Sequence, residues 1–229
     1  MAKKPSSALF GGGTYLVSEK NSAIEQLIDI NHLVDNYIVE DRDTIRIGAQ
    51  TVLQRLVDVL PGVFARSARW SCSSKNLRNQ RTLGGEIARS RPNSELVILL
   101  HALDAELAVY NGEKKQISIR LWDGSGIITA IQIKRSRFDQ ASLERTALLP
   151  SAPAFMICAG VRDPETLQLA IGGQSSRISN LSVPLEFLDG QLTELIDTAI
   201  KNFKDDHFGS LEYKQSLMRT NIQRLEKKQ

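Results

Sequence analysis

The chain has 229 residues, 41% of them hydrophobic, and its 29 lysines and arginines against 26 acidic residues give a formal net charge of +3. This composition is typical of a globular protein that buries a core of one or two domains. The longest uncharged stretches, such as 96–103 and 151–161, fall far short of the roughly 20 apolar residues of a membrane span, and no apolar signal core follows residues 1–7, so we expect a cytoplasmic protein.

The N-terminal part is predicted to contain short strands and a glycine turn. Residues 7–10 are apolar and end at the turn Gly11-Gly12-Gly13, and residues 24–30 form a second apolar segment. Residues 44–48 alternate between isoleucine and polar positions, which is typical of a half-buried strand.

Helical spacing appears next. Apolar residues over 52–60 recur at three and four positions, with Thr51 as the expected N-cap and Pro61-Gly62 as the end. A second unit begins at 77–87, where a glycine pair precedes a helix. The run 94–103 repeats leucines at helical steps after the expected cap residue Ser94.

Strands return in the middle of the chain. Residues 107–110 and 116–121 alternate around Asn111-Gly112, the strongest hairpin signal in the sequence. Residues 127–133 are a further strand candidate.

The last third has a different texture. We expect strands at 154–161 and 166–171 joined by a turn at Asp163-Pro164, an amphipathic helix at 192–203 and a charged terminal helix at 213–228. We therefore divide the chain into a ligand-binding domain at 1–136, with subdomains at about 1–60 and 61–136, and a smaller α+β domain at 137–229.

Cysteine and histidine usage argues against a metal site on this chain. Cys72 and Cys158 are far apart in sequence, and the histidines are scattered, whereas iron-sulfur and zinc sites need several clustered ligands. We expect two reduced thiols. Residues 66–91 are locally basic but carry no aromatic ladder or known module, so we expect no nucleic-acid partner.

Two glycine turns carry the main functional hypothesis. Gly11-Gly12-Gly13-Thr14 and Thr82-Leu83-Gly84-Gly85 both place backbone amides beside a hydroxyl, where no Cβ hinders a phosphate. Either turn alone is most often just a turn, but two in one small domain could hold a diphosphate from both sides. Neither matches the Rossmann fingerprint or the P-loop.

These turns belong to a set of ordered motifs that resembles a known family, the FAD-binding subunits of molybdenum hydroxylases such as xanthine dehydrogenase and carbon monoxide dehydrogenase. The resemblance spans most of the chain, and its most specific segment is 77–88. The matching segments are 9–14 (LFGGGT), 45–49 (IRIGA), 77–88 (LRNQRTLGGEIA), 99–105 (LLHALDA), 127–131 (IITAI) and 209–214 (GSLEYK).

The resemblance implies an α+β protein with a two-subdomain FAD-binding fold of the vanillyl-alcohol oxidase type. A C-terminal α+β domain with a small antiparallel sheet and helices would lie beside it. The implied function is electron transfer. Electrons from a molybdopterin cofactor on one partner subunit would pass through iron-sulfur clusters on another to FAD, and then to NAD or another acceptor.

By the same resemblance, the two glycine turns would bind the pyrophosphate and ribityl chain of FAD. No residue of this chain is expected to act as a general acid or base, because the cofactor carries the chemistry. The residues expected to bind the cofactor are Gly11, Gly12, Gly13, Thr14, Tyr15, Arg78, Thr82, Gly84, Gly85, Glu86 and Glu95.

Two departures from the family pattern motivate a rival hypothesis. Glu86 stands where the family usually has asparagine, and its carboxylate would repel a diphosphate unless it is paired, for instance with Arg89 or Arg91. The strand-helix unit that usually precedes the first glycine motif is also missing from this sequence. A scaffold subunit that keeps the fold without holding FAD is therefore the alternative. A stand-alone flavin oxidase would need a catalytic constellation that the sequence does not offer.

Overall fold

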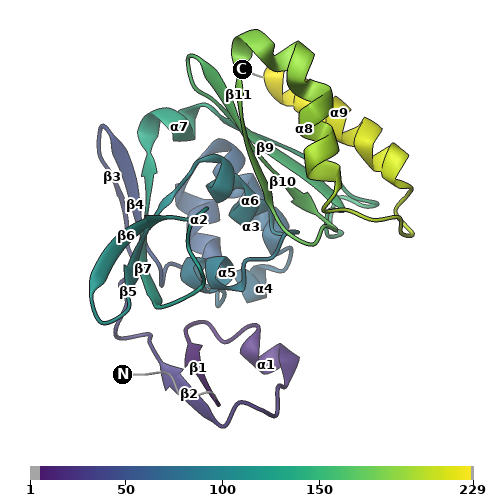
Figure 1. The fold of residues 1–229 in the computed structure, drawn as a ribbon. Helices are drawn as coiled ribbons and strands as arrows, with labels where there is room; N and C mark the ends of the chain where they lie inside the picture. The colour runs from purple at the N-terminus through teal and green to yellow at the C-terminus, as the bar shows by residue number, and fades with distance from the viewer. Residues whose placement is uncertain (1–5, 228–229) are drawn as a thin grey trace.

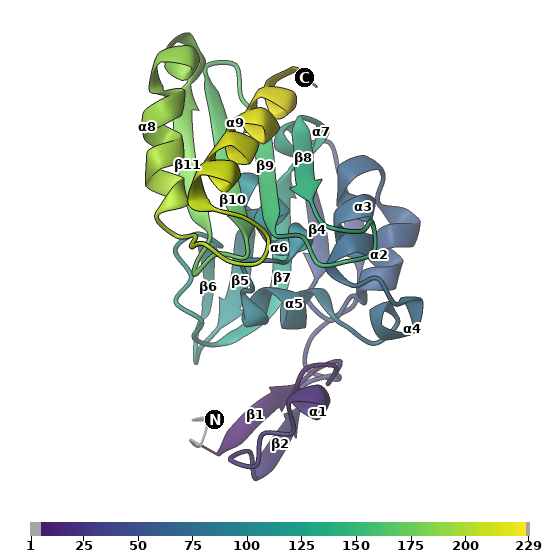
Figure 2. The same cartoon turned by 90° about the vertical axis from the view of Figure 1, so that its right-hand side faces the viewer.

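Three β-sheets organise residues 6–227, the part of the chain that the computed structural model describes. Figures 1 and 2 show a small N-terminal unit set apart from a larger body, in which helices lie between a five-stranded and a four-stranded sheet. The chain is thus an α+β protein, as expected.

The N-terminal unit contains a two-stranded parallel sheet. Strands β1 (Ser7–Phe10) and β2 (Gln26–Asp29) pair in register from Ser7 opposite Gln26, and the short helix α1 (Leu16–Glu19) lies between them in sequence. Both strands fall where the sequence predicted apolar segments.

The five-stranded sheet is antiparallel throughout, in the order β3-β4-β7-β5-β6. In β4, Ile45 and Ile47 are fully buried and Arg46 is exposed, which confirms the predicted alternation. The predicted hairpin also forms, although its second strand ends three residues earlier than expected. The strands are β3 (Ile38–Glu40), β4 (Thr44–Gly48), β5 (Glu106–Tyr110), β6 (Lys114–Ser118) and β7 (Ile127–Lys134).

Helices pack on the inner face of this sheet. The expected cap at Thr51 is wrong, because its hydroxyl donates to the Tyr37 carbonyl (3.1 Å) and its own carbonyl accepts from Leu83 N–H (2.9 Å). Val52 is the N-cap instead. Pro61-Gly62 separates two helices where the sequence predicted only an end. The helices are α2 (Leu53–Val59), α3 (Gly62–Ser71), α4 (Lys75–Arg78), α5 (Leu83–Arg89) and α6 (Glu95–Ala102).

Helix α6 lies at the centre of the body. Ser94 caps it by accepting a hydrogen bond from Val97 N–H (3.4 Å), which confirms the predicted start. Every residue from Glu95 to Ala102 is buried, because α6 packs on α3 and on strands of the four-stranded sheet. The four-stranded sheet therefore depends on this helix for part of its cover.

The C-terminal part is an antiparallel sheet in the order β11-β10-β9-β8, with two helices on one face (Figure 2). The predicted strand pair and both predicted helices are confirmed, and residue 228 of the terminal helix lies outside the described residues. The elements are α7 (Arg135–Asp139), β8 (Ala141–Thr146), β9 (Met156–Arg162), β10 (Thr166–Gly173), β11 (Ser179–Pro184), η1 (Leu185–Phe187), α8 (Leu188–Ile200) and α9 (Leu211–Lys227).

The largest hydrophobic core crosses the boundary that we placed at residue 136. It joins Leu99 of α6 and Ile131 of β7 to Ile157 and Ala170 of the four-stranded sheet, while a second core lies under α8 and α9. The division into 1–136 and 137–229 stays a prediction. Among residues 6–227, no helix has the length and apolar character needed to cross a membrane.

Candidate cofactor-binding cleft

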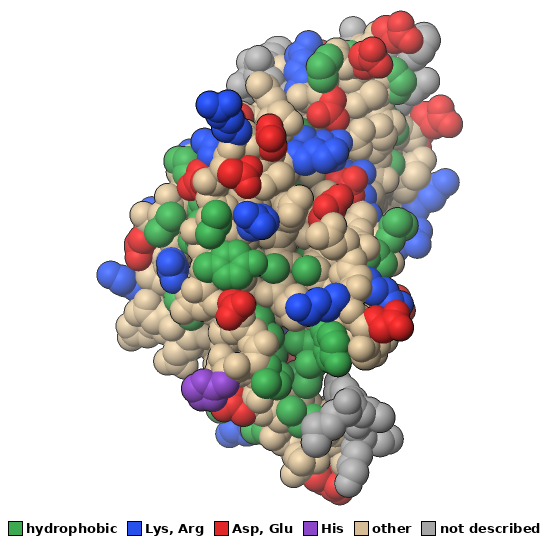
Figure 3. Space-filling view, turned by 90° about the vertical axis from the view of Figure 1, so that its left-hand side faces the viewer, with side chains coloured by type: hydrophobic (Ala, Val, Ile, Leu, Met, Phe, Trp, Pro, Cys, Tyr) green, Lys and Arg blue, Asp and Glu red, His purple; other side chains and the backbone are tan. Residues whose placement is uncertain are grey.

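A cleft of about 640 Å³ lies where the N-terminal unit meets the body. Residues of both glycine turns line it, including Gly12 and Gly84, as the sequence hypothesis requires. Figure 3 shows hydrophobic side chains along this junction. Small-molecule and cofactor sites typically measure roughly 300–1,000 Å³, and the cleft falls within this range.

The first turn offers unengaged backbone donors. Within the described part of the chain, the N–H groups of Gly11, Gly12, Gly13 and Thr14 donate to no other residue. Gly12 is packed against the segment just before the second turn, since a Cβ at this position would lie 1.9 Å from the Gln80 carbonyl oxygen. Four free amides at the wall of a cleft suit a diphosphate.

The second glycine turn forms the N-terminal end of helix α5. Its amides were expected to be free, and the structure corrects this expectation. Gly84 N–H donates to the Ala49 carbonyl (2.8 Å), and Gly85 N–H donates to the hydroxyl of the cap residue Thr82 (3.2 Å). A Cβ on Gly84 would lie 2.8 Å from that of Ala49. These glycines therefore allow close packing, and their amides are already engaged within the fold.

Three arginines surround Tyr15 at the cleft. The guanidinium carbons of Arg81, Arg89 and Arg91 lie 4.5, 5.2 and 4.8 Å from the centre of its ring. Arg81 also donates to the Thr14 hydroxyl at 3.4 Å. Burial, and then the Glu86 charge, raise the pKa of Tyr15. The cluster brings positive charge to the free amides, which favours an anionic ligand.

Glu86 is fully buried and does not line the cleft. Its carboxylate accepts from the Ser94 hydroxyl (2.6 Å) and from Arg91 (2.9 Å), and it lies 3.5 Å from an Arg81 nitrogen. Arg89 pairs with Glu19 instead. The expected repulsion of a diphosphate is thus offset by Arg91, one of the two partners considered from the sequence.

Two other predicted residues also lie away from the cleft. Arg78 is buried and donates to the Gln54 side chain and to the Cys72 carbonyl, at 2.8 and 2.7 Å. Glu95 pairs with Arg145 at 2.9 Å, and burial raises the pKa of its carboxyl. Both side chains are thus engaged by other residues of the protein. Direct contacts of Arg78, Glu86 and Glu95 with the cofactor stay a prediction, because none of these three residues lines the cleft. The other predicted residues line the cleft: Gly11, Gly12, Gly13, Thr14, Tyr15, Thr82, Gly84 and Gly85.

Sequence reasoning missed one wall of the cleft. This wall includes Trp122, Gly124, Ser125 and Gly126, followed by the first residues of β7. The closely spaced glycines were the available signal, but only the pairing of β7 with β4 and β5 brings this loop to the cleft.

Among the described residues, no group of three or more His, Cys, Asp or Glu side chains could hold a metal ion. Cys72 and Cys158 are free and buried, and burial raises the pKa of Cys158 to about 12 and also raises that of Cys72. Free amides, arginines and apolar walls therefore fit a cofactor with a diphosphate and planar rings, as the resemblance implied.

Comparison with known proteins supports this assignment. Residues 1–123 match the family model described as the FAD binding domain in molybdopterin dehydrogenase. The uncharacterized protein YgfM of Escherichia coli (strain K12) is 30% identical over 211 residues, which cover 90% of this chain and 81% of that protein.

Solved structures share the fold. Carbon monoxide dehydrogenase from Hydrogenophaga pseudoflava, in a form lacking the Mo-pyranopterin moiety of its cofactor, matches with a TM-score of 0.75 at 20% identity, covering 96% of this chain and 88% of that chain. Quinoline 2-oxidoreductase from Pseudomonas putida 86 matches with a TM-score of 0.74 at 16% identity, covering 97% and 88%. At these identities the likeness concerns the fold alone.

Proposed function

We propose a function for this chain from its family, since it belongs to the FAD-binding domains of molybdopterin dehydrogenases. In this proposal it is the flavin subunit of a cytoplasmic molybdenum hydroxylase of the xanthine dehydrogenase type. The observation that carries the proposal is the unengaged N–H groups of Gly11 to Thr14 in a cleft shared with the second glycine turn.

In this proposal the first turn binds the diphosphate of FAD through its backbone amides. Arg81 and Arg89 line the same cleft and offset the phosphate charge. Thr82, Gly84 and Gly85 let the cofactor lie close to the backbone of α5. Glu86 holds Arg81 and Arg91 in place from a position outside the cleft lining.

FAD supplies both one-electron exchange with clusters and hydride exchange with a nicotinamide. We propose that electrons arrive from iron-sulfur clusters on a partner subunit, after hydroxylation at a molybdopterin cofactor on another subunit, and leave to NAD or a different acceptor. The part played by this chain is to bind and orient the flavin and to exclude water from the diphosphate.

The first test is FAD binding by the purified chain and by the variant Gly11→Ala. A Cβ at Gly11 would make ordinary contacts of 3.4 Å with Gln50 and Thr82, so the fold should tolerate it. The methyl group would, however, enter the space between the turns. We expect FAD affinity to fall about tenfold or more, since a hydrogen bond to a charged group contributes about 1.5–3 kcal/mol.

Gly190→Ala is the matched control, because a Cβ there meets nothing within 4 Å. Protein that shows no absorbance at about 450 nm and takes up no added FAD would contradict the proposal and favour a scaffold subunit. For the finer assignment, the co-purified native complex should be assayed with purines and aldehydes, with NAD as acceptor. Activity on neither substrate class would contradict the xanthine dehydrogenase type.

A further inference from the structure

The loop that precedes β7 forms one wall of the cleft and is held by its own hydrogen bonds. The indole N–H of Trp122 donates to the Ser125 carbonyl at 2.8 Å, and Ser125 N–H donates to the Asp123 carboxylate at 2.9 Å. Gly124 and Gly126 adopt φ values of +86° and +82°, which side chains rarely tolerate. The loop therefore has a defined conformation, and its Trp122 belongs to the cleft wall.

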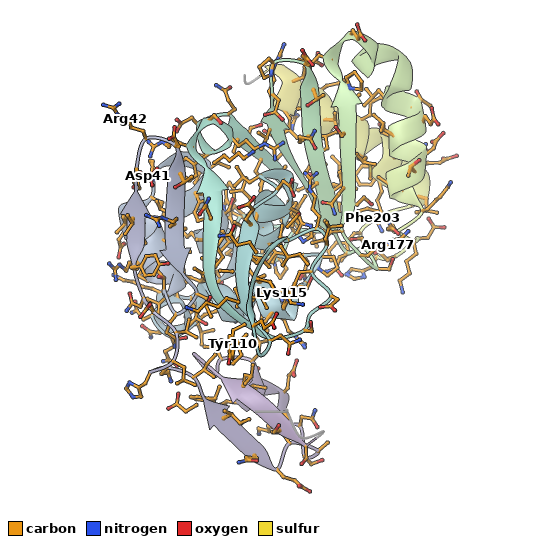
Figure 4. All side chains as sticks on the ribbon, turned by 60° about the vertical axis from the view of Figure 1, so that its left-hand side comes forward. Asp41, Arg42, Tyr110, Lys115, Arg177 and Phe203 are labelled. Carbon is orange, nitrogen blue, oxygen red and sulfur yellow. The ribbon has the colours of Figure 1, made fainter. Side chains whose placement is uncertain are left out.

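The loop is also anchored on the five-stranded sheet. A Cβ on Gly126 would lie 2.7 Å from a Val109 methyl carbon and 2.8 Å from the Tyr110 carbonyl oxygen. Figure 4 labels Tyr110 at the end of β5 that faces the β1–β2 unit. The loop thus holds its position at the junction that forms the cleft.

The chemistry of this wall suits a planar ring better than a sugar or a phosphate. Because the indole N–H of Trp122 is already engaged, the side chain offers the cleft mainly its aromatic surface. Ile127 and Ile128 continue this wall, and Val34 elsewhere in the cleft lining is also apolar. The unengaged amides lie on the first glycine turn instead, and Arg81 and Arg89 lie before and after the second turn in the chain.

We propose that Trp122 stacks against one of the two planar ring systems of the bound dinucleotide. This inference rests on the proposed FAD binding and adds a specific contact to it. The rings share the relevant chemistry, so ADP and FMN serve as separate probes for the adenine and the isoalloxazine.

The experiment compares FAD dissociation constants, measured by equilibrium dialysis, for Trp122→Leu and Trp122→Phe. Leucine removes the aromatic surface and keeps apolar bulk, and we expect roughly tenfold weaker binding, as for base-aromatic stacking. Phenylalanine also loses the hydrogen bond to Ser125 but keeps a ring, so its affinity should stay close to that of the wild type. Equal losses in both variants would instead assign the effect to the loop hydrogen bond and overturn the inference.

Trp70→Leu is the matched control. Trp70 is the other tryptophan. It lies on α3, with the Arg145 guanidinium 5.4 Å from its ring centre, and it does not line the cleft. We expect unchanged FAD affinity for this variant, and thermal unfolding without cofactor checks that each variant is folded.

The two probes then show which ring is stacked. If Trp122 contacts adenine, Trp122→Leu weakens ADP and leaves FMN unchanged; if it contacts the isoalloxazine, the reverse holds. Should Trp122→Leu bind FAD, ADP and FMN as tightly as the wild type, the inference fails while the proposed function stands. Should the wild type bind no FAD, the proposed function fails and the inference with it.

Discussion

Glu86 connects the two glycine turns through its arginine partners. It is fully buried and lies within hydrogen-bonding or ion-pair distance of Arg81, Arg91 and Ser94. Arg81 in turn reaches the hydroxyl of Thr14 on the first turn. The residue that looked unfavourable for a phosphate site from sequence therefore becomes, in the fold, the anion that organises the cations beside it.

Replacing this carboxylate should destabilise the protein. Glu86→Gln keeps the shape but leaves two arginines without their buried counter-charge, and removing one partner of a buried ion pair costs about 3–5 kcal/mol. We expect a loss at the lower end, about 3 kcal/mol, because the Arg91 side chain is 28% exposed. Urea unfolding measures it, with the exposed Glu113→Gln as control. Equal unfolding midpoints for the two variants would contradict this role.

At the scale of elements, sequence patterns predicted those strands and caps whose signals are local. The alternation at Thr44–Gly48, the Asn111-Gly112 hairpin and the Ser94 cap are all present. Helix α3 was missed because Pro61-Gly62 is a valid helix end as well as a valid helix start. The predicted cap at Thr51 failed because tertiary hydrogen bonds to Tyr37 and Leu83 engage that residue.

The cleft could be predicted only in part, because tertiary contacts decide which of its groups are free and which loops reach it. Glycines in two loops are visible in sequence, and their convergence follows from the resemblance. Whether an amide is free depends on distant partners such as Ala49, which engages Gly84 N–H. Similarly, Trp122 reaches the cleft only because strand order places β7 between β4 and β5.

The contact between α6 and β11 predicts a pH dependence of stability. His101 lies 3.2 Å from the Asn180 side chain and is buried, and burial lowers its pKa from 6.5 to about 4. The folded state therefore binds this proton less readily than the unfolded state does. The contribution of His101 to stability is fully present above about pH 6.5 and is lost progressively as the pH falls towards 4. Below about pH 4 this residue causes no further change in stability.

We expect the free energy of unfolding to fall by up to about 1.4 kcal/mol per pH unit in this window from His101 alone. Urea unfolding of the wild type and of His101→Gln at pH 7.5 and 5 measures the difference, since glutamine does not titrate. The exposed His32→Gln serves as control and should behave as the wild type. An identical pH dependence in His101→Gln would show that another group is responsible.

At the scale of the whole molecule, the two large sheets share one hydrophobic core. All residues of α6 are buried, and the core that contains Leu99 also contains Ile157 and Ala170 from the four-stranded sheet. Hydrophobic burial contributes roughly 25 cal/mol per Å² of apolar surface, so exposing one side of α6 would remove a substantial part of the stability. The cleft lies between the N-terminal unit and this body, and Ala49 and Ile128 belong both to its lining and to the shared core.

This shared core yields a prediction for the fragment 1–136, the expected FAD-binding domain. It retains the glycine turns and the Trp122 loop but loses the strands that cover α6, so we expect it to lack a cooperative unfolding transition. Calorimetry and hydrogen exchange on the fragment and on the full chain test this. Slow exchange within α6 in the fragment, with a sharp transition of its own, would show that residues 1–136 fold independently. In that case the core shared across residue 136 would act as an interface between two domains.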